Sequence, residues 1–451
     1  MTLTGPGRAP GPERGGEPSP SPEAHPRRMS VSGAAFLGVG AMVGAGIFAL
    51  LGEAGALAES AVWLSFLLGG VVAVLLGYTV SKLSCRFPSK GGLVAYLHEG
   101  FGDSHVTGSA SWLFYLAGVI VTAMVALSFG SYASALLLPE DAAAVWVKVF
   151  ATVAVVAMAL VFVIGPNAVG RLQSLIVVVL LAVFAVFIVV IIGEADFGLL
   201  AVATYPPLTD IVSAVALTFF AYLGFAVIAT TAESLDDPVR SVPRATYIAL
   251  AITISLYVLI SVGVYGTLTV AEVIASGDTA LAAAAEPALG QAGYTMMAIA
   301  ALLATASSVN ANLFAAGNLT ANLAQTREFP PVFGKPARVL GTMGVVITVG
   351  LVLILALFLD LSTIADVGSA VALAIFTLVG IAAIRLRRET DSNLFILLAA
   401  VTATFAVLVL FAIDTAREAP RTFAAMLVVG AIAVVLDLIW KSQRPSVVDG
   451  A

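Results

Sequence analysis

Residues Gly38–Phe48 read GVGAMVGAGIF, and their four glycines fall inside an apolar run that extends from about residue 31 to 52. Glycine weakens a helix because it adds backbone freedom and packs no side chain. The run itself is long enough to cross a hydrocarbon core of about 30 Å, which needs about 20 helical residues. We therefore expect a membrane-spanning helix that is broken close to mid-membrane.

A second interrupted run lies at 210–234, where residues 219–225 read FFAYLGF. The two runs are the first and the sixth. Because they are five spans apart, an odd number, one is expected to cross outward and the other inward, as in an inverted repeat. Glycine-interrupted spans at corresponding positions of two halves point to a transporter binding site, and unwound backbone at this depth must line protein or a water-filled cavity. The alternative is that glycine only permits close helix packing, and we give this interpretation to Gly38, Gly40 and Gly55.

The whole chain has the composition of a multi-spanning membrane protein. Of its 451 residues, 60% are hydrophobic and 11% are charged, against about 45–50% and 25% in soluble domains. We predict an all-α polytopic membrane protein with twelve transmembrane helices, in which helices 1–5 and 6–10 form an inverted repeat and helices 1 and 6 are broken. The twelve apolar runs lie near residues 31–52, 60–82, 106–138, 143–164, 171–193, 210–234, 243–268, 291–325, 340–359, 362–386, 393–413 and 420–440.

The positions of lysine and arginine predict the orientation, because these residues are enriched in cytoplasmic loops. With the N-terminus inside, the outer segments hold only Lys148, Arg417 and Arg421, and the inner segments hold the other 18 of the 21. Both termini are therefore expected in the cytoplasm, in a multi-pass protein of the cell's inner or plasma membrane. The expected parts are a disordered tail at 1–28, a twelve-helix domain at 29–440 with repeats at about 31–193 and 208–388 and two further helices at about 393–440, and a tail at 441–451.

Several classes of site and partner are excluded by composition. The chain has one cysteine and three widely separated histidines, His25, His98 and His105, so neither a disulfide framework nor a Cys/His metal site can form within it. We expect no metal and no cofactor, and we interpret His98 and His105 as part of a solvated turn. Because the net charge is only −6 and no basic stripe with interleaved aromatics is present, we expect the lipid bilayer and not nucleic acid as a partner.

Motifs along the chain resemble those of the amino acid-polyamine-organocation (APC) superfamily of permeases. The family signature G-[SA]-G-[IV]-F is similar to GAGIF at 44–48, and the signature across the end of span 6 is similar to the sequence from Phe220 to Ala245. The second loop, from Phe87 to Gly102, and the pair Phe329-Pro330 are similar as well. Together these similarities cover spans 1 to 10.

The resemblance implies where a substrate binds. In this family, freed N–H groups at the span 1 break hold the carboxylate of an amino acid, and freed carbonyls at both breaks hold its ammonium group. Helix ends have the charge for this, since the N-terminus carries about half a positive charge and the C-terminus the reverse. The implied substrate-binding residues are Met42, Gly44, Ala45, Gly46, Ile47, Phe219, Phe220, Ala221, Tyr222 and Gly224.

Within this set, we expect Gly44, Ala45 and Gly46 on the carboxylate side. Phe219, Phe220 and Tyr222 either bound the side-chain pocket or belong to the ordinary core. The chain has almost no ionisable residues at the expected membrane depth, which suits a site made from helix ends.

Two departures from the family pattern concern charge and coupling. Ala226 stands where many relatives have an acid, and the fifth predicted span contains no lysine after Arg171. The missing acid predicts a neutral zwitterion as substrate. The resemblance implies a proton as coupling ion, but the missing lysine and acid remove two groups through which relatives couple protons, and Na⁺ is the alternative. Ser307 and Ser308 are either Na⁺ ligands or partners in helix-to-helix hydrogen bonds.

Four charged residues beyond the span 6 break are candidates for coupling or gating. Glu233 lies one to two turns past the break, and partial burial is expected to raise its pKa if it relays protons. Asp237, Arg240 and Arg244 either form ion pairs that open with a gate or only set the topology.

These features favour a secondary active transporter of amino acids that uses alternating access and proton symport. An exchanger or a Na⁺-coupled permease of the same fold is the alternative within this class. An amino acid sensor and a membrane-embedded enzyme are the alternatives outside it. We expect no enzyme, because the sequence offers no nucleophile paired with a base and no metal cluster.

Overall fold

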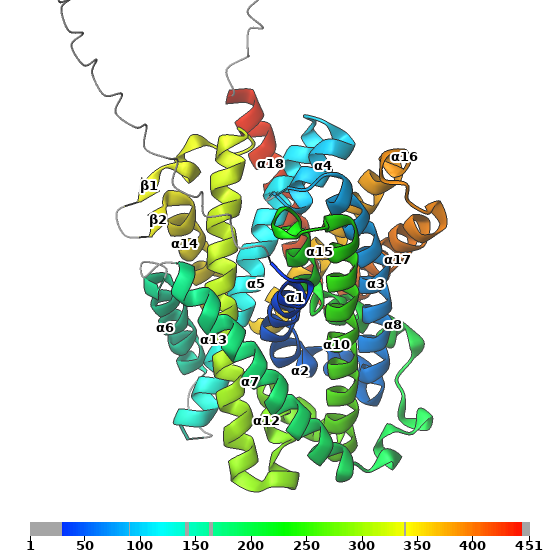
Figure 1. Ribbon diagram of the computed structural model, residues 1–451. Helices are drawn as coiled ribbons and strands as arrows, with labels where there is room; N and C mark the ends of the chain where they lie inside the picture. Colours follow the sequence, from blue (N-terminus) through cyan, green and yellow to red (C-terminus); the bar gives the residue numbers. More distant parts are fainter. Residues whose placement is uncertain (1–28, 90, 140–143, 162–165, 338–339, 444–451) are drawn as a thin grey trace, which may run out of the picture.

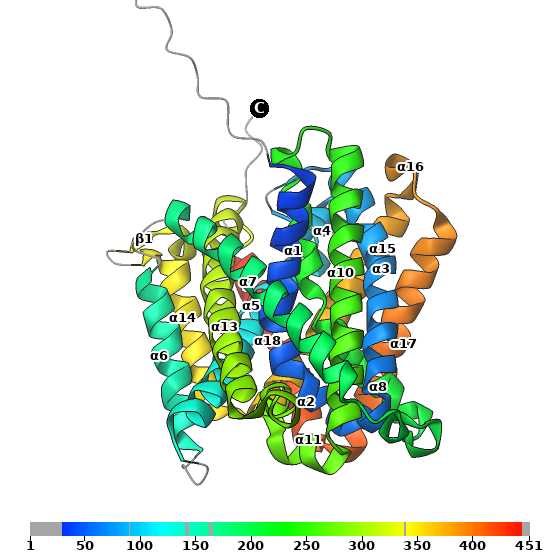
Figure 2. The ribbon, with the colours of Figure 1, turned by 60° about the horizontal axis from the view of Figure 1, so that its bottom comes forward.

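The computed structural model describes residues 29–89, 91–139, 144–161, 166–337 and 340–443, and these residues are largely helical (Figure 1). The predicted tail at 1–28 and residues 444–451 of the predicted C-terminal tail lie outside them. Both ends of the described chain lie at one face of the helix bundle, and α11 (Val270–Ser276) lies at the other (Figure 2). We call these the terminal face and the opposite face.

The helices of the first half correspond closely to the predicted spans. The first span is divided between two helices, and a short helix not predicted as a span follows the second. Their bounds are α1 (Val31–Ala45), α2 (Ile47–Ala58), α3 (Val62–Arg86), α4 (Leu93–Phe101), α5 (His105–Leu137), α6 (Val145–Val161) and α7 (Pro166–Gly193).

The second half begins with another interrupted helix. Its helices are α8 (Leu208–Phe220), α9 (Ala226–Ala229), α10 (Pro238–Thr267), α11, α12 (Ala280–Ala283), α13 (Glu286–Gln325), α14 (Met343–Phe358), α15 (Leu361–Arg385), α16 (Arg387–Thr390), α17 (Leu394–Glu418) and α18 (Pro420–Gln443). The 3₁₀ turns are η1 (Glu59–Ala61), η3 (Phe197–Leu200), η4 (Val202–Thr204), η5 (Leu223–Phe225), η6 (Ala232–Ser234), η7 (Gly277–Thr279) and η8 (Pro331–Gly334). Strands β1 (Pro336–Ala337) and β2 (Gly341–Thr342) form a small antiparallel pair before α14.

Polar residues set the starts of several helices. The Ser30 hydroxyl accepts a hydrogen bond from the Gly33 N–H at 3.1 Å where α1 begins. At α11, Thr269 and Glu272 cap each other reciprocally, which satisfies N–H groups that have no partner within the helix.

Nine apolar segments in the described residues are long enough to cross a membrane, and three shorter apolar helices, α1, α6 and α14, accompany them. One of the nine runs from Ile47 to Arg86 and contains both α2 and α3, which meet at η1, where Glu59 has a φ of 46°. The chain is therefore a multi-pass, all-α membrane protein.

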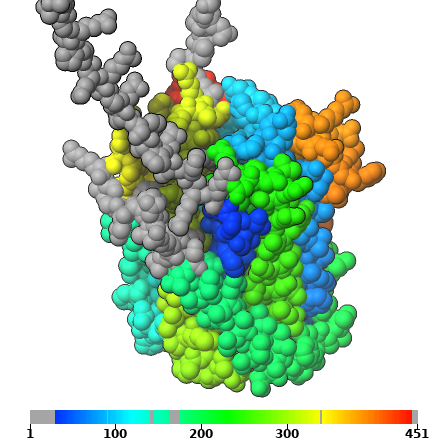
Figure 3. All heavy atoms as spheres, in the orientation of Figure 1, coloured from blue at the N-terminus to red at the C-terminus, as the bar shows by residue number. Residues whose placement is uncertain are grey.

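The core lies where the two halves meet. Helix α3 packs against α10, and α5 packs against α13. By contrast, 28% and 22% of the most apolar stretches of α17 and α18 are buried, against 78% for α15, so α17 and α18 form an edge. In the space-filling view, α17 (orange) lies at that edge and α1 (blue) reaches the surface beside α10 (Figure 3).

The structure explains why glycine occupies positions 38 and 40, where we predicted that it permits close packing of helices. A Cβ at Gly38 would lie 2.5 Å from Ile228, and a Cβ at Gly40 would lie 2.5 Å from Val177. Glycine lets these helices approach more closely than any larger residue would.

Candidate substrate site

The break in the first span is a single residue. Between the end of α1 and the start of α2, Gly46 has φ −89° and ψ −78°, and its N–H donates to the Met42 carbonyl oxygen at 2.8 Å. Ala45 on one side is partly buried and Ile47 on the other is fully buried. Because the first N–H groups of a helix have no partner within it, the start of α2 presents donors and a positive dipole end at this point.

The break in the sixth predicted span is longer. Helix α8 ends at Phe220, and the chain continues through η5, α9 and η6 before α10 begins at Pro238. The Tyr222 N–H donates to the Phe219 carbonyl at 2.9 Å, and the Phe225 N–H donates to the Tyr222 carbonyl at 3.1 Å. These bonds between residues three apart tighten the helix into 3₁₀ turns, and the end of α8 presents carbonyl groups.

The two breaks are in contact. A Cβ at Gly46 would lie 2.8 Å from the Ala221 carbonyl oxygen and would overlap the Tyr257 hydroxyl of α10. At the other break, a Cβ at Gly224 would lie 2.5 Å from the Met42 nitrogen. Both positions admit only glycine, because the neighbouring atoms include backbone that cannot move aside like the end of a side chain.

Tyr257 joins the two helix ends. Its hydroxyl donates to the Ala221 carbonyl at 3.4 Å and also hydrogen-bonds the Ile47 backbone, and its side chain is fully buried. Tyr257 was not predicted as a site residue, because its only signal in the sequence is that of a polar aromatic residue inside an apolar span.

Helix α13 covers the first break from another side. A Cβ at Gly44 would lie 3.0 Å from the Ser308 Cβ and 3.0 Å from the Ala304 carbonyl oxygen. Ser308 is buried, and Ser307 is partly buried. The structure therefore brings Ser308 against Gly44, as a ligand group near the first span would require.

The predicted aromatic residues at the second break are all buried, but their surroundings differ. Phe219 packs edge-on against Phe376 of α15, with ring centroids 5.6 Å apart, and Phe220 also lies against α15. The Tyr222 hydroxyl donates to the Phe66 carbonyl of α3 at 3.0 Å. Tyr222 is thus anchored to a neighbouring helix by its polar atom.

The charged residues beyond the second break lie at the surface. Glu233, Asp237, Arg240 and Arg244 are all exposed, so the partial burial expected for Glu233 is wrong. Asp237 caps α10 by accepting from the Arg240 N–H at 3.4 Å, and Arg240 Nε lies 3.8 Å from Asp237 Oδ2. An exposed pair of this kind contributes about 0–1 kcal/mol.

Three acids that were not predicted as site residues lie near the opposite face. Glu53 belongs to α2, Asp278 to η7 and Asp366 to α15, and each side chain is partly buried. Glu53 interacts electrostatically with both Asp278 and Asp366. Glu53 and Asp366 lie within apolar segments, and neither was singled out from the sequence because a single acid in an apolar helix hardly changes the hydropathy of the run.

A further polar cluster ties α18 to α5 and to the end of α13. His105 Nδ1 lies 2.7 Å from Asp437 Oδ2, and Asp437 is only 1% exposed although His105 is 65% exposed. Lys441 Nζ lies 3.9 Å from Asp437 Oδ1, and the Trp440 indole N–H donates to the Arg327 carbonyl at 2.8 Å. His105 is therefore the partner of a buried acid as well as a solvated residue.

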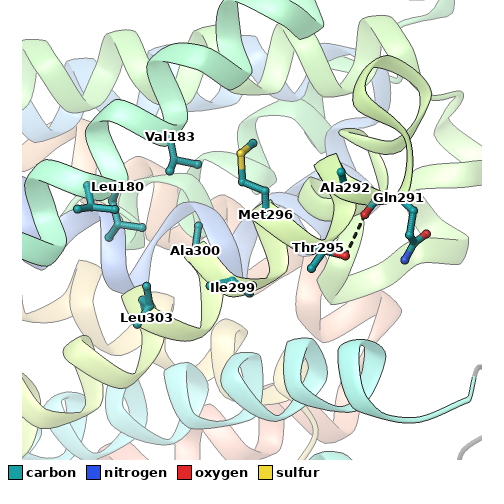
Figure 4. A pocket seen from close by; sticks show the side chains of 10 residues that line it. Leu180, Val183, Gln291, Ala292, Thr295, Met296, Ile299, Ala300 and Leu303 are labelled. Carbon is teal, nitrogen blue, oxygen red and sulfur yellow. Dashed lines mark hydrogen bonds between the residues drawn. The ribbon is translucent and has the colours of Figure 1, made fainter.

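A groove of about 560 Å³ lies between α7 and α13, and its lining residues include none of the residues at the breaks (Figure 4). Its walls are mostly aliphatic and include Leu180, Val183 and Leu303. The Thr295 hydroxyl on its edge donates to the Gln291 carbonyl at 2.9 Å. A zwitterion finds no opposed helix ends there, so the breaks remain the candidate site.

Several proteins similar to this chain are named as transporters. A family model described as "Amino acid permease" matches residues 29–436. The inner membrane transport protein YbaT of Escherichia coli (strain K12) is 34% identical over 375 residues, which cover 83% of this chain and 87% of that protein. The methylthioribose transporter of Bacillus subtilis (strain 168) is 25% identical over 80% of this chain and 82% of its own length, and the serine/threonine exchanger SteT of the same strain is 24% identical over 65% and 67%.

Proposed function

The chain belongs to the amino acid permease family, and from this premise we propose that it moves neutral amino acids across the cytoplasmic membrane by alternating access. Membership in this family makes it a transporter and not an enzyme. Its relatives carry names as different as serine/threonine exchanger and methylthioribose transporter, so the substrate is part of the proposal.

The proposal includes twelve crossings and an inverted repeat. The nine long apolar segments and the three shorter helices support twelve crossings, with α1 and α2 forming the first and α3 the second. In each half, a broken helix is followed by long helices and by one helix of 17 or 16 residues, α6 or α14, and then by α7 or α15. We infer from the lysine and arginine positions that the terminal face is cytoplasmic and the opposite face is external.

The observation that carries the proposal is the contact of the α2 start with the α8 end, at Gly46 and Ala221. A carboxylate bound to the N–H groups of α2 and an ammonium bound to the carbonyls of α8 need no charged side chain. The Tyr257 hydroxyl already bonds both helix ends, so an entering zwitterion replaces it there.

Charge selectivity follows from what surrounds the breaks. Ala226 provides no acid beside the second break, and burying an uncompensated second cation costs several kcal/mol. Neutral amino acids are therefore the preferred substrates over arginine and lysine. The coupling ion in this proposal is the proton, and exchange or Na⁺ coupling is the alternative.

The test is uptake by the purified protein in proteoliposomes, with a panel of radiolabelled amino acids and methylthioribose under imposed pH or Na⁺ gradients. The proposal expects uptake of neutral amino acids, acceleration by an inward proton gradient, and weak competition by arginine and lysine. Uptake driven by Na⁺ alone would contradict proton coupling. Transport of methylthioribose without any amino acid would contradict the substrate class.

A further inference from the structure

Three partly buried carboxylates converge at the opposite face from separate elements, α2, η7 and α15. Glu53 interacts electrostatically with Asp278 and with Asp366, and the Ser131 hydroxyl of α5 donates to Asp278 Oδ2 at 2.5 Å. In the described part of the chain, no lysine, arginine or histidine forms an ion pair with any of the three. Like charges in a shared, partly dehydrated site cannot all remain ionised at low cost.

The backbone closes tightly around this acid triad, which we define as Glu53, Asp278 and Asp366. A Cβ at Gly52 would lie 2.6 Å from the Gly277 carbonyl oxygen, so α2 and η7 are in direct backbone contact beside Glu53. Helix α2 also packs against α15, which carries Asp366. Separating α2 from η7 and α15 would hydrate all three carboxylates.

A tyrosine hydroxyl near Asp278 and another beside α2 both lack hydrogen-bond partners among the residues that the structure describes. Tyr132 is fully buried, interacts electrostatically with Asp278, and its hydroxyl has no hydrogen-bond partner among the residues that the structure describes. The Tyr265 hydroxyl is likewise buried and without such a partner, and it lies against Gly55 of α2. A buried hydroxyl left without a partner beside carboxylates indicates that a further hydrogen-bonding species belongs at the site.

We propose that the acid triad binds a proton at the external gate of this transporter, so that protonation closes the gate and deprotonation opens it. The proton enters from external water and converts one carboxylate into a carboxylic acid, which donates a hydrogen bond to a neighbouring carboxylate. This proposal rests on the proposed function, which makes the opposite face external.

A proton suits the triad better than a metal ion. No group of three His, Cys, Asp or Glu side chains within the described ranges is arranged to hold a metal. Among the described residues, the interactions recorded around the acid triad and Tyr132 involve acids and phenols. Tyr132 of α5 interacts with Asp278 and with Tyr294 of α13, and Tyr265 of α10 interacts with Glu59 after α2.

The titration of Asp278 has the direction that the proposal requires. Burial raises the pKa of Asp278 above its ordinary value, and the hydrogen bond from Ser131 opposes this only in part. A raised pKa in the closed state means that protonation stabilises the closed state at low pH. This stabilisation is lost as the pH rises through the raised pKa.

The test measures opening of the gate by thiol labelling. In a Cys85→Ala background, Ala54→Cys places a thiol at a fully buried position of α2 beside Glu53, and a membrane-impermeant maleimide reports its exposure. Labelling of Ala56→Cys, which is exposed on the same helix, corrects for the intrinsic pH dependence of the reagent. The corrected rate is expected to rise about tenfold from external pH 5.5 to 8, equivalent to about one unit of pKa difference.

Variants assign the pH dependence to the triad. Asp278→Asn, Asp366→Asn and Glu53→Gln are each expected to reduce the tenfold change to less than about twofold, and Glu286→Gln, an exposed acid at the start of α13, should leave it unchanged. A corrected rate that does not depend on pH overturns the proposal, as does Asp278→Asn behaving like Glu286→Gln. Labelling needs no transport, so these results stand apart from a failure of the proposed function, which would appear as absent amino acid uptake.

Discussion

The two breaks that form the candidate site are built in different ways. The first is one glycine, and its position is fixed by atoms that leave no space: the Ala221 and Met42 carbonyls and the Tyr257 hydroxyl. The second runs from Ala221 to the start of α10 and is held by hydrogen bonds, including the one from Tyr222 to α3. Added volume is therefore unfavourable at both breaks, at Gly46 and at Gly224, whereas the longer second break also depends on hydrogen bonds along several residues.

The largest expected effect is that of bulk at the first break. Gly46→Leu is expected to raise the Kd of a neutral amino acid about 100-fold or more, because overpacking costs about 1–3 kcal/mol and the added atoms also occupy the ligand position. Isothermal titration or scintillation proximity binding to the purified protein measures this.

The matched control is Gly350→Leu in α14, where a Cβ would meet no neighbouring atom within 4 Å. This variant should bind substrate normally. Unchanged affinity in Gly46→Leu itself would place the site elsewhere.

The second largest effect is expected to be tighter substrate binding. Tyr257→Phe removes the hydroxyl that bonds both helix ends in the empty protein, and a hydrogen bond contributes about 0.5–1.5 kcal/mol. Because substrate replaces this hydroxyl, the variant should bind substrate about fivefold more tightly. It should also melt at a lower temperature when empty, measured by differential scanning fluorimetry. Weaker binding would mean that the hydroxyl contacts the ligand directly.

Tyr222→Phe separates anchoring from ligand contact at the second break. The bond from Tyr222 to Phe66 is expected to contribute about 0.6 kcal/mol, a typical value for membrane helices. Its loss should lower the melting temperature slightly while the Kd changes by less than about twofold. A tenfold change in Kd without a change in melting temperature would assign Tyr222 to the substrate pocket.

The smallest effect is expected at Glu233. The residue is exposed, so Glu233→Gln should change both uptake and its pH dependence by less than about twofold. Uptake over external pH 5.5 to 8 in proteoliposomes measures this. Loss of proton-driven accumulation with exchange retained would restore Glu233 as a coupling residue.

Sequence reasoning predicted the helices well because membrane spans depend on long apolar runs. The break at Gly44 to Gly46 was also predicted from the sequence. Clustered glycines weaken the helix backbone locally, and this effect does not depend on contacts with distant residues. Tyr257 and the acid triad were missed because their importance comes from the packing of α10, η7 and α15 against α2, and no local pattern encodes that packing. Glu233 was overvalued because distance along the chain from the break says nothing about exposure to solvent.

The cluster at the last helix has a mechanical consequence. Helix α18 is bonded to α5 through Asp437 and His105, and to the chain beyond α13 through Trp440 and Arg327. A displacement of α5 relative to α13 would have to break at least one of these two connections. Helix α18 therefore couples the position of the start of α5 to that of the chain that follows α13.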